Sequence, residues 1–170
     1  VVLAVKAPGL PDVARSIAPL LGPDTIVLTA MNGVPWWFLD GFGGAAQGHA
    51  LQSVDAGGDI ARAIPTRHVV GSVVHTSCSL EAPGIARQHF GNRLMVGEPD
   101  GSQSARLQAL VAMLQRGGID ALQRDLQLVT GQALVEQTQS AGDVHAFQPE
   151  QAPVPPQVAG KTIAVRPVGL

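Results

Sequence analysis

Short runs of apolar residues, separated by glycine and proline, divide the first part of the chain into recognisable elements. The run Val1–Val5 is almost continuously apolar, which is typical of a parallel strand covered on both faces. Helical spacing follows from Pro11 to Gly22, with proline tolerated at the start and glycine favoured at the end. A second β-branched run occupies Thr25–Thr29. Strand, helix and strand in this order predict a parallel βαβ unit.

The middle of the chain is rich in strand-forming patterns. After a glycine-rich loop over 41–50 and a short helical segment that ends before Pro65, three runs have strand character. These runs are HVVGSVVHTS (68–77), GIARQHF (84–90) and RLMVGE (93–98). The sequences EAPG and GN between them supply turn residues, so three short strands are predicted.

A further helix follows this β-rich section. Ser102 is a suitable N-cap, and a closing Gly-Gly pair stands at 117–118. One face of the helix carries Leu107, Leu110, Val111 and Leu114. The predicted fold is therefore α/β, a partial doubly wound, Rossmann-like parallel sheet with a β-rich extension.

Composition changes after residue 121. Eight of the 14 glutamines lie between Gln123 and Gln157, and FQPEQAPVPPQ brings four prolines into one short stretch. Proline at this density is incompatible with a regular element. Residues 1–121 are therefore interpreted as one domain, and 122–170 as an unassigned, irregular or non-native tail, as a shifted reading frame or an unrelated fused sequence would produce.

The composition otherwise indicates a globular protein, since 45% of the residues are hydrophobic and 14% are charged. A formal net charge of −2 gives no electrostatic reason to expect nucleic acid or a membrane surface as a partner. No apolar run approaches the roughly 20 residues of a membrane span. Cys78 is the only cysteine, which favours a reducing compartment, here the cytoplasm. The five histidines lack metal-ligand spacing, so no metal site is predicted.

Polar residues follow both strands of the βαβ unit. Lys6 follows the first, and Asn32-Gly33 follows the second. Ligands of open α/β sheets bind just beyond the carboxyl ends of strands, and an ammonium and an amide would suit a polar ligand there. A surface lysine and a turn-forming Asn-Gly pair explain the same residues equally well. Glu98 and Asp100 in GEPDG are expected on an exposed turn.

Several segments together resemble one enzyme family. LAVKA, TIVLTAMNGVPWWF, LQSVDAGGDIARAIP and APGIARQHFGNRLMVGEPDG occur in order and resemble ketopantoate reductases, the 2-dehydropantoate 2-reductases, over about residues 1–121. The resemblance implies a partial NADP-binding domain of an enzyme that uses NADPH to reduce 2-dehydropantoate to pantoate, on the route to pantothenate and coenzyme A.

The resemblance also implies roles for individual residues. Lys6 and Asn32 would contact the cofactor together with Gly33, and Asn32 would also touch the substrate. Ser77 would line the cofactor. Trp36 and Trp37 would be packing residues of a helix after the asparagine loop, consistent with the large apolar area of tryptophan.

Two departures limit this inference. The family begins with a G-x-G-x-x-G turn, which does not precede Val1 here, and its helical substrate domain opens with a W-x-K lysine that acts as general acid. The two lysines present, Lys6 and Lys161, do not match that motif. No catalytic residue is therefore assigned, and the fragment is expected to be inactive. Two alternatives stay open: another NAD(P)-dependent 2-keto acid oxidoreductase, or a non-catalytic remnant or interaction domain that self-associates through an exposed sheet edge.

Overall fold

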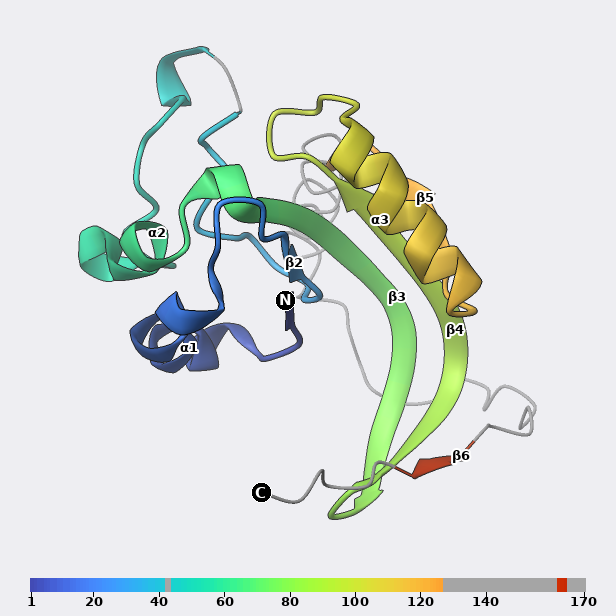
Figure 1. The fold of residues 1–170 in the computed structure, drawn as a ribbon. Helices are drawn as coiled ribbons and strands as arrows, with labels where there is room; N and C mark the ends of the chain where they lie inside the picture. The colour runs from blue at the N-terminus through green and yellow to red at the C-terminus, as the bar shows by residue number, and fades with distance from the viewer. Residues whose placement is uncertain (42–43, 127–161, 165–170) are drawn as a thin grey trace, which may run out of the picture.

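The structure, a computed structural model, describes residues 1–41, 44–126 and 162–164 (Figure 1). Its strands and α-helices are β1 (Val2–Leu3), α1 (Leu10–Ser16), β2 (Val27–Thr29), α2 (Asp59–Ala63), β3 (Val69–Ala82), β4 (Ile85–Gly97), α3 (Ala105–Arg116), β5 (Asp120–Gln123) and β6 (Thr162–Ala164).

The strands form one sheet in the order β1-β2-β3-β4-β5, and β6 adds to β4. β1, β2 and β3 are mutually parallel, β3 and β4 are antiparallel, and β5 is parallel to β4. The α/β fold class predicted from the sequence is confirmed.

Helices cover both faces of the sheet, as the near-continuous apolar strands require. Val27 and Val69 belong to a core packed with residues of α1 and α2, whereas Leu28 and Val70 belong to a second core packed under α3. This alternation follows from the two-residue period of a strand. Figure 1 shows α1 and α2 on one side of the sheet and α3 on the other, which is the doubly wound arrangement.

The β-rich section differs from the prediction in its strand count. The two expected strands at 84–90 and 93–98 form the single strand β4, and β3 continues to Ala82. The expected turn at Gly91-Asn92 is instead a bulge inside β4. These two residues have no paired partner on β3, because the pairing passes from His75–Arg93 directly to Ser77–Phe90. Gly91 has φ +74°, and a Cβ there would lie 2.2 Å from the carbonyl oxygen of His75. The prediction was wrong because a bulge glycine and a turn glycine look alike in sequence.

Two corrections concern helices. The N-cap of α3 is Ser104, whose Oγ accepts a hydrogen bond from Leu107 N at 3.1 Å; the backbone N of Ser102 instead donates to the Asp100 carboxylate. The tryptophans lie in a run of turns rather than in a helix, with three-residue backbone bonds from Phe38 N to Pro35 O and from Asp40 N to Trp37 O. Their packing role is confirmed, since Trp36 and Trp37 are both buried in the core.

A pair of glycines explains how the core packs against the open end of the hairpin, where β3 begins and β4 ends. Gly71 and Gly97 are direct cross-strand partners. A Cβ at Gly71 would lie 2.4 Å from the Trp37 ring, and one at Gly97 would lie 2.9 Å from the Leu126 side chain. The missing side chains therefore create the space that Trp37 and Leu126 fill.

Parts of the tail that sequence reasoning expected to be irregular are regular. β5 extends to Gln123, Leu126 is buried in the core, and β6 pairs antiparallel with Ile85–Arg87 of β4. Three- and four-residue strands carry too few residues for a periodic pattern to stand out. The other residues of the expected tail, including its proline-rich stretch, lie outside the described residues.

Candidate functional site

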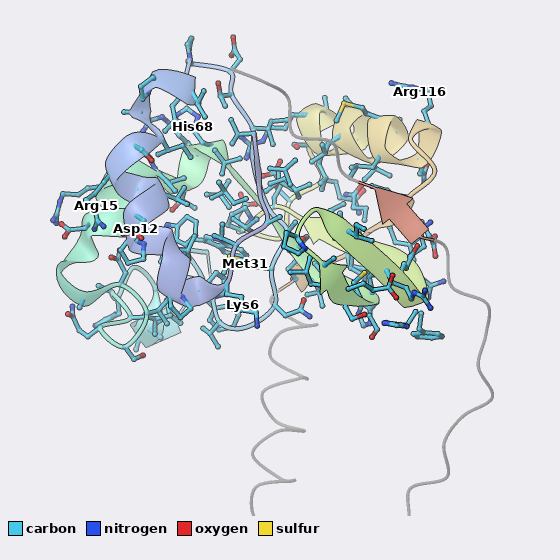
Figure 2. All side chains as sticks on the ribbon, turned by 90° about the horizontal axis from the view of Figure 1, so that it is seen from below. Lys6, Asp12, Arg15, Met31, His68 and Arg116 are labelled. Atoms are coloured by element: carbon cyan, nitrogen blue, oxygen red, sulfur yellow. The ribbon has the colours of Figure 1, made fainter. Side chains whose placement is uncertain are left out.

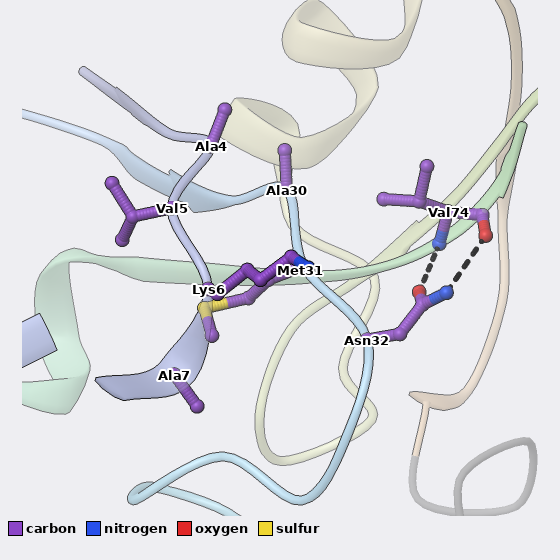
Figure 3. Close-up of a pocket in the computed structure, with 8 residues that line it drawn as sticks. All are labelled: Ala4, Val5, Lys6, Ala7, Ala30, Met31, Asn32 and Val74. Atoms are coloured by element: carbon purple, nitrogen blue, oxygen red, sulfur yellow. Dashed lines mark hydrogen bonds between the residues drawn. The ribbon is translucent and has the colours of Figure 1, made fainter. Parts of the chain in front are cut away.

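A cavity of about 480 Å³ lies at the carboxyl ends of β1 and β2, where open α/β sheets bind ligands. Its lining consists of three short segments, one after each of these strands and one from β3. They contribute Ala4, Val5, Lys6, Ala7, Ala30, Met31, Asn32 and Val74. Figure 2 shows Lys6 and Met31 on the same side of the molecule, and Figure 3 shows all eight residues around the cavity.

Lys6 stands where the chain leaves β1. Its backbone is extended, and its carbonyl accepts a hydrogen bond from Gly9 N at 2.8 Å, which begins the turn into α1. The side chain is exposed, and no described residue forms an ion pair or hydrogen bond with its ammonium group. Lys6 therefore offers a positive charge to a ligand in the cavity.

Asn32 makes a peptide-like pair of hydrogen bonds across the sheet. Its Nδ2 donates to the Val74 carbonyl oxygen at 3.0 Å, and its Oδ1 accepts from Val74 N at 2.7 Å (Figure 3). The side chain thereby extends the β2–β3 pairing, which otherwise ends at Thr29 and Gly71. One N–H of the amide and one lone pair of Oδ1 are left for a ligand.

The remaining two predicted residues lie differently. Gly33 has φ +105° and open space where a Cβ would stand, so the backbone beside Asn32 is accessible. Ser77 is exposed on β3, three residues beyond Val74, and is not part of the cavity lining. The structure thus brings Lys6 and Asn32 together at one cavity and leaves Ser77 outside its wall.

Sequence reasoning missed Met31 and Val74 as lining residues. Both are apolar and read as core positions, and nothing in their sequence context distinguishes a cavity wall from a core. The one usable signal was position, because Met31 directly precedes Asn32 after β2.

The lining combines an apolar surface with two polar groups. Ala4, Ala30 and Val74 offer a surface for a flat ring, Lys6 can neutralise an anionic group, and Asn32 can donate and accept a hydrogen bond. This chemistry suits a ligand that combines a flat ring with an anionic group. The lining can bind and orient such a ligand.

A second charged cluster is structural. Glu98 was expected on an exposed turn, but it is only 4% exposed. Its carboxylate accepts hydrogen bonds from Arg106 Nε at 2.8 Å and Arg106 Nη2 at 2.5 Å, and from Ser104 Oγ. Arg106 also donates to the carbonyl oxygens of Arg67 and Val69, so the pair ties α3 to the start of β3.

These contacts set the protonation of Glu98. Burial works against the charged form, but the hydrogen bonds from Arg106 and Ser104 outweigh it and lower the pKa of Glu98 below its ordinary value. The same carboxylate raises the pKa of Arg106. With both charges committed to each other, this cluster holds α3 in place and offers little to a ligand.

Within residues 1–41, 44–126 and 162–164, no group of three or more His, Cys, Asp or Glu side chains is arranged to hold a metal ion. Among the same residues, no helix has the length and apolar character needed to cross a membrane.

Comparisons with known proteins agree with the resemblance in sequence. A 2-dehydropantoate 2-reductase from Mesorhizobium japonicum is 44% identical over 125 residues, which are 74% of this chain and 38% of that protein. A crystal structure assigned to a ketopantoate reductase from Ralstonia solanacearum MolK2 is 51% identical, with a TM-score of 0.72 over 76% of this chain and 40% of that one. No family model matches the sequence.

A complex of D-mandelate dehydrogenase with NADH shares the fold at 19% identity, with a TM-score of 0.54 over 73% of this chain and 35% of that one. Fold and site together define an α/β domain with a ligand cavity at the carboxyl ends of its parallel strands. Over about three-quarters of its length the chain is similar to ketopantoate reductases, and it spans about two-fifths of the length of the Mesorhizobium and Ralstonia relatives.

Proposed function

We propose that residues 1–126 are part of the cofactor domain of a 2-dehydropantoate 2-reductase, and that the cavity at Lys6 and Asn32 holds the nicotinamide end of NADPH. The observation that carries this proposal is the convergence of these two residues at the carboxyl ends of β1 and β2. The 44% and 51% identities to the two named relatives support the choice of family.

In the complete enzyme the cofactor supplies a hydride to the ketone carbon of 2-dehydropantoate. Lys6 would attract an anionic part of the cofactor. Asn32 would orient the nicotinamide and the substrate with the side-chain N–H and the Oδ1 lone pair that do not bond to Val74. Gly33 would allow close approach to the backbone, and Ser77 would contribute from β3 if that part of the strand turns toward the bound cofactor.

The 170-residue chain itself should not catalyse the reduction of 2-dehydropantoate. It carries neither a lysine in a W-x-K motif nor a glycine-rich phosphate turn, so binding and proton transfer are both incomplete. The cytoplasm suits the single thiol and a small polar substrate.

A second candidate is another NAD(P)-dependent oxidoreductase of 2-keto acids. The D-mandelate dehydrogenase complex favours it only through the shared fold. Since one fold hosts many activities, substrate choice must come from the site, and the sequence identities favour 2-dehydropantoate.

The proposal is tested by titrating the 15N-labelled chain with NADPH and with reduced nicotinamide mononucleotide, which lacks the adenosine half. Saturable amide shifts are expected at Lys6, Met31, Asn32, Gly33 and Val74 for both ligands, with dissociation constants in the millimolar range because the phosphate turn is missing. Shifts confined to other residues, or no shift, would refute the assigned cavity.

Lys6→Gln provides the specific variant and Lys161→Gln its control, since each removes one of the chain's two lysine charges. Lys6→Gln is expected to weaken the interaction with NADPH roughly threefold, the scale of an exposed ion pair. Lys161→Gln should leave it unchanged.

A further inference from the structure

Among the described residues, no strand pairs with one edge of β3 along most of its length. β2 pairs with β3 only at 69–71, and the Asn32 side chain continues the pairing as far as Val74. From His75 to Glu81 no described residue hydrogen-bonds to this edge, and all seven residues are exposed. A regular surface strand buries every second side chain, so seven exposed residues in a row show that this stretch lies away from the core.

The opposite side of the hairpin is covered. β4 pairs with β3 along its length, with register shifts between His75 and Ser77, Ser77 and Cys78, and Leu80 and Ala82. The outer edge of β4 is in turn paired with β5 at 93–96 and with β6 at 85–87. In Figure 1 the turn end of the β3–β4 hairpin, the arm, extends beyond the helices. The free edge HTSCSLEA (75–82) contains no proline and no lysine, the residues that usually protect an edge strand from pairing.

We propose that this edge pairs with the same edge of a second copy of the chain, giving a two-fold symmetric, antiparallel β3–β3 contact centred on Cys78. In this register His75 lies opposite Glu81 of the second copy, Thr76 opposite Leu80, Ser77 opposite Ser79, and Cys78 opposite Cys78.

Charge complementarity selects the second copy and this register. A two-fold contact forms each cross-strand pair twice, so the imidazole of His75 meets the Glu81 carboxylate at both ends of the contact. A shift of the register by one residue would place Glu81 opposite Thr76 and lose both pairs. Glu81 also forms an ion pair at 2.5 Å with Arg87 of β4 in its own chain, so in the contact His75 would share this carboxylate with Arg87. The contact would also cover Leu80, which is 74% exposed.

Cys78 makes the proposal measurable. Directly opposed residues of antiparallel strands have Cα atoms about 4.5–5.5 Å apart, within the range that a disulfide can bridge. The thiol is exposed in the structure. The contact includes none of the residues that line the cavity and shares only Ser77 with the proposed function, so the dimer can be tested separately from cofactor binding.

The test combines analytical ultracentrifugation under reducing conditions with mild oxidation by diamide, which takes two electrons and two protons from a pair of thiols. The full chain is expected to form a concentration-dependent dimer, and oxidation should link it almost completely through Cys78. The double variant C78S/S79C moves the thiol by one residue. In the proposed register position 79 opposes position 77, so the two relocated thiols are diagonal neighbours about 7–8 Å apart and should link poorly.

A mixture of C78S/S77C with C78S/S79C should restore linking, because these positions face each other across the two-fold axis. His75→Glu should weaken the dimer roughly five- to tenfold by opposing like charges twice. His49→Glu introduces the same charge at an exposed residue outside the hairpin and should leave the dimer unchanged.

Three results would overturn the proposal. A chain that stays monomeric at all concentrations has no such contact. Equal linking at positions 77, 78 and 79 would show random collision instead of a register. A dimer whose Cys78 resists both diamide and thiol alkylation would place the interface elsewhere.

Discussion

The hairpin of β3 and β4 passes through two environments within one pair of strands. Near the helices, Val69 and Val70 of β3 are fully buried, and so is Val96 of β4. Beyond Val74, every residue of β3 from His75 to Glu81 is exposed. Backbone pairing between the two strands is continuous across this boundary apart from the bulges.

The comparison shows that β3 and β4 stay paired as strands whether or not their side chains are buried. The buried half is stabilised by two layers of helices, at about 1.5–3 kcal/mol for each fully buried aliphatic side chain. The exposed arm has only cross-strand pairs, each contributing roughly 0.2–1 kcal/mol. Isolated two-stranded ribbons are marginal, so the arm depends on the packed half to hold it in register.

The largest expected difference is between two leucines of this hairpin. Leu94 of β4 is 8% exposed, whereas Leu80 of β3 is 74% exposed. Leu94→Ala should lower the free energy of unfolding by about 3 kcal/mol, because it opens a cavity under α3. Leu80→Ala should change it by less than about 0.5 kcal/mol. Urea unfolding of both variants in the monomeric concentration range measures the difference. Similar losses would show that the arm is packed in solution.

Two Glu–Arg pairs at the same 2.5 Å separation give the next test. The Glu98 side chain is 5% exposed and that of Arg106 is 35%, while Glu81 and Arg87 on the arm are 35% and 44% exposed. Glu98→Gln should cost about 2 kcal/mol, below the usual range for a broken buried pair because Arg106 remains partly solvated. Glu81→Gln should cost less than about 0.5 kcal/mol.

The buried pair also predicts a pH dependence. Because the folded-state pKa of Glu98 is lowered from 4.5, its stabilising contribution is complete above that value and is lost as the pH falls through the folded-state pKa. The urea midpoint of the unmodified chain should therefore fall more steeply below pH 4.5 than that of Glu98→Gln. Parallel curves for the two proteins would show that this carboxylate has an ordinary pKa.

The sequence predicts the buried strands of the sheet well and the exposed arm of the hairpin poorly. Val1–Val5 and Thr25–Thr29 have the β-branched runs of buried parallel strands, and both contain strands in the structure. The arm carries alternating small and polar residues that satisfy no burial pattern, so β3 was predicted to end near Ser77 instead of Ala82. Gly91 was interpreted as a turn for the same reason, since only the partner strand reveals a bulge.

The candidate site was predictable by position but not by contact. Lys6 and Asn32 follow strands, and the rule for open α/β sheets brings them to one cavity. Asn32 hydrogen-bonds to Val74 because β3 continues past the end of its pairing with β2. No local sequence pattern predicts how far β3 continues. Glu98 was likewise predicted to lie on an exposed turn, because the sequence does not show that the fold brings Arg106 within hydrogen-bond distance of its carboxylate.

The smallest expected effect concerns the point where the packed half ends. Asn32 holds Val74 through two hydrogen bonds, one in each direction. Asn32→Ala removes both and should speed hydrogen exchange of the Val74 amide about fivefold, which corresponds to roughly 1 kcal/mol.

Asn32→Asp distinguishes the two bonds. A carboxylate still accepts from Val74 N but opposes the Val74 carbonyl oxygen, so the amide should stay protected while the pairing is strained. Asn92→Asp is the control, because Asn92 bonds to Gly118 on the other side of the hairpin and should leave Val74 unaffected. If Asn32→Ala left exchange at Val74 unchanged, the arm would be held by the β3–β4 ladder alone, and Asn32 would keep its whole amide for a ligand.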